Sequence, residues 1–135
     1  MVGDEDERRS LILSLFACLE CATGLGLILA PDLRICLLFG QTESVPVTLL
    51  LARLGGAALL AVGAMSWGAG TFHRSQAGLS LLIGVTLYNG LAALVLAYSA
   101  FGLAMRGVLI WPAMLLHAAL LLWCLASALR MQRQR

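Results

Sequence analysis

The sequence contains no lysine and has few charged residues of any kind. Charged side chains make up 12% of its 135 residues and hydrophobic side chains 61%, whereas a soluble domain has about 25% and about 45–50%. So few polar groups cannot cover the surface of a water-soluble fold. The composition therefore excludes an ordinary cytosolic enzyme, a secreted disulfide scaffold and a nucleic-acid binder. It indicates a small integral membrane protein that lies in the lipid bilayer.

Several catalytic signatures are also missing. The sequence has no glycine-rich phosphate loop, no nucleophile elbow and no zinc-binding spacing. It also places no pair of carboxylates within an apolar stretch. Hydrolysis and phosphoryl transfer need such groups, so we expect no enzymatic activity of these kinds and predict no cofactor.

What the sequence does contain is long apolar stretches. A membrane-crossing helix needs about 20 mostly apolar residues. Four stretches qualify, at about 10–29, 45–69, 77–97 and 107–129. The loops between them are short, so neighbouring helices should be antiparallel. We therefore predict an all-α, integral membrane, antiparallel four-helix bundle over residues 10–129, between a charged tail (1–9) and a basic tail (130–135).

The placement of the arginines predicts the orientation. With four spans, both termini and the middle loop lie on one side, which holds six arginines, while the other side holds only Arg34 and Arg106. Because basic residues are retained in the cytoplasm, we expect both termini to be cytoplasmic.

The segment between the first two spans begins with Pro31 and ends with Gly40. Proline suits the first position of a helix, and glycine suits the position just after its end. Two interpretations are open: a short helix that lies in the outer interface, or an extension of the first span beyond the lipid.

Small residues recur four positions apart in two of the spans, a spacing that lets helix backbones approach closely. The pairs are Ala52 with Gly56, Ala57 with Ala61, Ala64 with Gly68, Thr86 with Gly90, and Ala93 with Ala97. They predict either tight packing within the chain or a contact between two copies.

Each span carries one strong polar group near its middle, and such groups are costly in lipid. They are Glu20, Arg53, Asn89 and His117, and Tyr88 adjoins Asn89. At about 1.5 Å per residue, the four lie about 12–18 Å from the start of their spans. The hydrocarbon core is about 30 Å thick. The sequence therefore predicts one polar layer near mid-membrane.

Glu20 and Arg53 are the only charges deep in the spans, and their signs are opposite. We predict an ion pair between the first and second helices, because a charge in lipid needs a partner. Tyr88, Asn89 and His117 would satisfy the remaining donors and acceptors. This layer is either a structural network that fixes helix register or a site for a proton, an ion, a quinone or a small polar ligand.

Cys18 and Cys21 share one face of the first span, a spacing that can serve redox chemistry or a metal. Soft metal sites usually want four ligands, and only Cys124 and His117 could add to them at this depth. We therefore interpret the cysteines as small apolar fillers and predict no metal site. Haem is disfavoured because the other histidine, His73, lies in a loop.

A family resemblance rests on the second span, residues 51–63, which read LARLGGAALLAVG. This stretch resembles an Arg-Leu-x-Gly…Gly pattern of small four-helix bacterial membrane proteins of uncharacterised function, loosely DoxX-like. Tyr88-Asn89, and Pro112 followed by His117, also look like members of those families. The resemblance implies a bacterial inner-membrane location and, for DoxX-like proteins, a link to quinone-dependent sulfur oxidation.

Small multidrug transporters also have four helices and a lone glutamate in the first. Here Arg53 would neutralise Glu20, whereas a proton-coupled carrier needs a carboxylate that is free to exchange its proton. The chain departs from that family at this point.

Two functions remain after these exclusions. The first is a non-catalytic accessory, assembly or interaction subunit, either a homodimer or part of a larger membrane complex, without nucleic acid. The alternative is a transport or quinone-linked redox protein that binds a small or lipophilic ligand, or a proton, at the Glu20, Arg53 and His117 layer. A fully paired layer would favour the first, and a route from the surface to Glu20 would favour the second.

Overall fold

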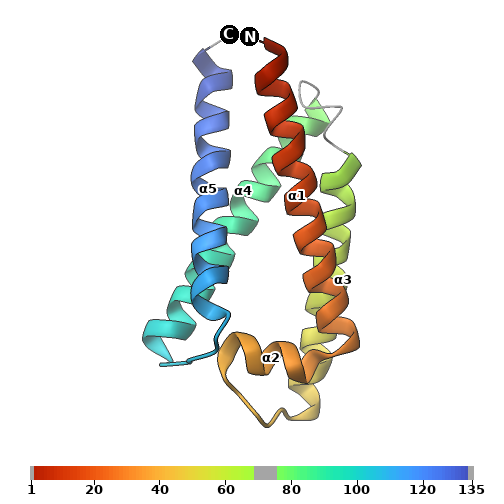
Figure 1. The fold of residues 1–135 in the computed structure, drawn as a ribbon, viewed down its shortest axis with the longest axis vertical. Helices are drawn as coiled ribbons and strands as arrows, with labels where there is room; N and C mark the ends of the chain where they lie inside the picture. Colours follow the sequence, from red (N-terminus) through yellow and green to blue (C-terminus); the bar gives the residue numbers. More distant parts are fainter. Residues whose placement is uncertain (1, 69–75, 134–135) are drawn as a thin grey trace. The chain divides into compact units, whose positions relative to one another are not determined.

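A computed structural model gives the fold and describes residues 2–68 and 76–133, with their side chains over 11–67 and 78–129. Helices account for nearly all of this part of the chain (Figure 1), and it contains no strand. The elements are α1 (Val2–Leu29), α2 (Pro31–Phe39), α3 (Pro46–Gly68), α4 (Gln76–Ala97), the π-helix η2 (Tyr98–Gly102) and α5 (Ile110–Arg133). The predicted all-α class is confirmed.

Four of the helical segments are long and apolar enough to cross a membrane, as the sequence predicts. They are Leu11–Leu29, Pro46–Trp67, Gly78–Gly102 and Ile110–Leu129. Large apolar side chains stay exposed on them, among them Leu50 (65%) and Leu94 (68%). Side chains of this kind face hydrocarbon in a bilayer, so the chain is a small integral membrane protein.

The charged ends of the chain are helical where the structure describes them. α1 begins at Val2 and α5 ends at Arg133, so most of the predicted tails 1–9 and 130–135 continues the spans. The middle loop with His73 and Arg74 lies outside the described residues.

The segment after α1 is a separate helix, α2, and the alternative of a longer first span is wrong. The guanidinium of Arg34 lies against Gly26 of α1, although eight residues of one straight helix would span about 12 Å. The chain must therefore turn after Leu29. α2 ends at Phe39, and the next residue, Gly40, has a φ of +75° and donates its amide to the Cys36 carbonyl at 2.8 Å, a common way to terminate a helix.

The chain divides into two compact units, each described here on its own. In the first, Met1–Arg34 with Glu43–Leu81, α1 and α3 form an antiparallel pair. Their backbones touch at Gly24 and Gly56, where a Cβ on either residue would come within 2.6 Å of the other's carbonyl oxygen. Gly56 therefore serves packing within the chain, one of the two outcomes its spacing predicts.

The second unit, Ile35–Thr42 with Leu82–Arg135, pairs α4 and η2 with α5. η2 closes the third span with wide turns, in which Leu103 donates its amide to Tyr98 at 3.1 Å. The Phe101 ring then meets the Trp111 ring edge to face, with 5.4 Å between centroids. The chain thus reverses from η2 into α5, and these two segments run antiparallel.

The loop before α5 is tied to the end of α2. Leu109 donates its backbone amide to the Leu37 carbonyl at 2.8 Å. Gly107 also lies directly against the Leu38 backbone, where a side chain would not fit. These contacts fix the start of α5 relative to the end of α2. They thereby set the position of each α5 residue along the helix axis.

Candidate functional site

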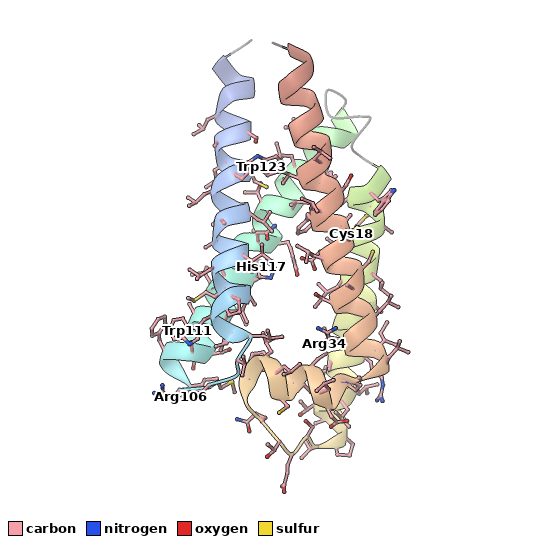
Figure 2. The ribbon with its side chains drawn as sticks, in the orientation of Figure 1. Cys18, Arg34, Arg106, Trp111, His117 and Trp123 are labelled. Carbon is pink, nitrogen blue, oxygen red and sulfur yellow. The ribbon has the colours of Figure 1, made fainter. Side chains whose placement is uncertain are left out.

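The structure gathers three of the five predicted polar-layer residues in one unit. Tyr88 and Asn89 on α4 contact His117 on α5, and Figure 2 shows His117 on the side of α5 that faces α4. Glu20 and Arg53 belong to the other unit. The two groups are therefore described separately.

Asn89 is the centre of the first group. Its side chain is fully buried, and its Nδ2 donates a hydrogen bond to the Val85 carbonyl at 2.8 Å, one turn earlier in α4. A carbonyl can only accept, so this bond fixes the amide with its nitrogen toward Val85. The oxygen, Oδ1, is left to accept from another helix.

The partner of that oxygen is His117. Its Nδ1 lies 2.9 Å from Asn89 Oδ1. Because Oδ1 has no hydrogen, Nδ1 must carry the proton and donate it. A neutral imidazole has one N–H and one lone pair, so the lone pair lies on Nε2. The Val85–Asn89–His117 chain thus selects one histidine tautomer.

Tyr88 fixes the imidazole from a second direction. The two rings meet edge to face at 81°, with 5.5 Å between their centroids, a favoured arrangement of aromatic rings. One hydrogen bond and one ring contact therefore hold His117, and both come from neighbouring residues of α4.

The second nitrogen of His117, Nε2, forms no hydrogen bond with any residue that the structure describes. In that part of the chain, every buried side-chain nitrogen and oxygen has a partner. Nε2 therefore keeps some accessible surface of its own. It presents an unused acceptor within a membrane span.

The other polar side chains of the spans are satisfied by their own helices. Ser66, Thr86 and Ser99 donate to the carbonyls of Val62, Leu82 and Val95, at 2.8, 2.6 and 2.9 Å. Each acceptor lies four residues earlier, the usual bond for such hydroxyls in a helix. These residues need no ligand to explain them.

Arg53 lies near the end of α1 rather than in the middle of the membrane spans. Its side chain is exposed, and its Nε donates to the Ile28 carbonyl at 3.3 Å. The last carbonyls of a helix lack partners within it and attract cations. Arg53 therefore caps α1 from a neighbouring helix.

Glu20 is buried in α1, with 5% of its surface exposed. The predicted ion pair of Glu20 with Arg53 is not confirmed, and the hydrogen bond that Arg53 donates goes to the Ile28 carbonyl instead.

The helix register explains why these two residues do not meet. Gly24 lies against Gly56, and Cys21 lies against Gly63, so the level of Glu20 falls near residues 60–64 of α3. Arg53 is at least about two helical turns away, or about 10 Å along the axis. The depth of Arg53 was counted from the start of the second span. That count made Arg53 too deep, because α3 begins several residues beyond the level of the end of α1.

The two cysteines of the first span lie in different surroundings. Cys18 is exposed, while the Cys21 sulfur packs against Gly63 of α3. Over residues 2–68 and 76–133, no group of three histidine, cysteine, aspartate or glutamate residues is placed to hold a metal ion. The contact with Gly63 fits the interpretation of Cys21 as a small packing residue.

Sequence reasoning named Tyr88, Asn89 and His117 but not the bonds among them. The signal was their depth, since Asn89 and His117 were counted from opposite faces to nearly the same level. It also missed Arg34, whose guanidinium packs on Gly26. An isolated arginine in a loop carries no pattern that would indicate this contact.

Comparison with known proteins does not show a family for this chain. No protein-family model, no curated protein and no solved structure matches the chain.

Proposed function

We propose that this protein is a non-catalytic accessory or interaction subunit of a membrane complex. Four apolar helices with short connections make up most of the described residues. Its partners are the lipid bilayer and either a second copy or another membrane protein. We further propose a bacterial inner-membrane location with both termini in the cytoplasm, supported by the arginine distribution and the DoxX-like resemblance.

One observation carries this proposal. In the part of the chain that the structure describes, no buried side-chain nitrogen or oxygen is left without a partner. The Asn89 side chain is bonded both to its own helix and, through His117, to a second helix. A polar bond between two helices holds them in register, which is what a structural subunit requires.

The partner is tested by purification from native membranes in a mild detergent. Ala57, Ala61 and Ala64 remain exposed on α3, and small residues let another helix approach closely. We expect one stoichiometric partner, with its recovery lowered by Ala61→Phe. Leu54→Phe changes another exposed residue of the same helix and serves as the control. Recovery of the chain alone would contradict the proposal.

A second candidate is ligand or proton handling at the polar layer, in transport or quinone-linked redox. The observation that favours it is the unused Nε2 of His117. Arg53 is left out of this candidate, since it caps α1. A His117→Gln variant that accumulates normally but loses a transport or redox activity would support this candidate. A variant that fails to accumulate would support the structural role.

A further inference from the structure

We propose that His117 Nε2 is a binding site for the hydroxyl group of a lipophilic compound, a phenol or an alcohol dissolved in the bilayer. This inference rests on the second candidate function and names its ligand class. It is independent of whether the protein has a protein partner.

The tautomer decides the class of ligand. Nδ1 holds the only proton of the neutral imidazole and donates it to Asn89, so Nε2 can only accept. A carbonyl compound such as an oxidised quinone offers no donor to this nitrogen, whereas a hydroxyl compound does. The site therefore selects donors over acceptors of similar shape.

The surroundings favour a compound that partitions into lipid. His117 lies in the span Ile110–Leu129, about 10 Å along the helix from its start. The span is apolar, and Leu115 (64%) and Leu116 (39%) are exposed on other faces of its helix. A hydroxyl at this depth meets few acceptors, because hydrocarbon offers none, so a fixed imidazole lone pair is a favourable partner.

The geometry also favours a single hydrogen bond over a metal. A histidine that ligates a metal usually donates its other nitrogen to an oxygen, as His117 does. Yet among the described residues no further histidine, cysteine or carboxylate joins it in a metal-binding group. A ligand that needs only one acceptor fits the residues present.

The tautomer itself is the first test. A His73→Gln variant keeps His117 as its only histidine. With 15N-labelled histidine in phosphatidylcholine vesicles, whose headgroups donate no hydrogen bond, solid-state NMR distinguishes the two tautomers. We expect a protonated Nδ1 and an unprotonated Nε2. A protonated Nε2 overturns the proposal.

The ligand class is tested with a matched pair of probes. A long-chain alkylphenol and its methyl ether share shape and partitioning, but only the phenol donates. We expect the phenol to shift the Nε2 resonance saturably and to bind about five- to ten-fold tighter than the ether, the difference expected for one hydrogen bond. Equal shifts from both probes overturn the proposal, since water or lipid then satisfies Nε2.

A long-chain alcohol, compared with its own methyl ether, separates the two sources of the hydroxyl. A response to the phenol alone assigns the site to aromatic hydroxyls, and a response to both assigns it to lipophilic hydroxyls generally.

Variants of Asn89 and His117 distinguish hydroxyl binding at Nε2 from a purely structural role of the Asn89–His117 bond. Asn89→Leu removes the acceptor of Nδ1, so we expect mixed tautomers and weaker phenol binding. His117→Phe should abolish the preference for the phenol. If these variants do not fold, the wild-type tautomer and the probe pair still decide the matter. A failure here leaves the proposed accessory function untouched, because that function is tested by its protein partner.

Discussion

Asn89 shows how one residue determines the chemistry of another. Its amide is held by its own helix through Val85, which turns its oxygen toward α5 and fixes the proton of His117. The sequence predicts that Asn89, Tyr88 and His117 share a level, because each lies near the middle of an apolar stretch. It does not predict which atom faces which, since that depends on helix rotation.

Glu20 and Arg53 give the sharpest residue-scale test. Pairing them was the strongest prediction from charge alone, and the register of α1 against α3 instead separates them. We expect Glu20→Gln and Arg53→Gln to have additive effects on the free energy of unfolding, within about 0.5 kcal/mol. Arg53→Gln alone should cost less than about 1 kcal/mol, as expected for a cation at a helix end.

Detergent-titrated unfolding of both single variants and the double variant measures this coupling. A buried ion pair would instead cost about 3–5 kcal/mol when broken from either side. A coupling of that size would show that Glu20 and Arg53 form an ion pair, and it would contradict the register of α1 against α3 described above.

Gly56 and Gly55 form a matched pair of neighbours. A Cβ at Gly56 would meet the Gly24 carbonyl oxygen at 2.6 Å, whereas one at Gly55 would meet nothing within 4 Å. We expect Gly56→Ala to destabilise the protein by about 1–3 kcal/mol, because the helices must move apart. Gly55→Ala should be neutral or stabilising by up to about 1 kcal/mol, since alanine favours helix. The same unfolding titration measures both, and equal effects would refute the close contact.

At the scale of elements, hydrophobicity and length were sufficient to predict the four spans, because a membrane demands about 20 apolar residues from any crossing helix. Their ends were harder to predict. The third span continues through η2 to Gly102, and the turn after Leu29 that separates α2 is marked in the sequence only by Pro31. Tertiary contacts, such as Arg34 on Gly26, decide such boundaries.

The pairing of α4 with α5 rests on the Asn89–His117 bond. We expect Asn89→Leu and His117→Leu each to destabilise the protein, because each leaves a polar partner unsatisfied. The double variant should be less destabilised than the sum of the two, with a coupling of about 0.6 kcal/mol and at most about 1.7 kcal/mol. A double-mutant cycle followed by thermal unfolding in detergent checks this. Strict additivity would mean that the bond does not form.

At the scale of the whole molecule, the distribution of the arginines predicts the orientation in the membrane, with both termini in the cytoplasm. Gln41 follows α2, and Gln132 lies near the end of α5, so the two residues report on opposite ends of the spans. Glutamine is uncharged, so replacing either one by cysteine leaves the charge distribution unchanged. In a background without the four native cysteines, we expect a membrane-impermeant maleimide to label Gln41→Cys on intact cells. Gln132→Cys should react only after lysis. The reverse pattern would place the termini outside.

The central claim is that this small membrane protein acts through a partner rather than through a reaction. Native mass spectrometry of the protein released from its own membrane tests it most directly. We expect one stoichiometric complex with another copy or another membrane protein, without a tightly held redox cofactor. A lone chain that carries a stoichiometric cofactor would contradict it.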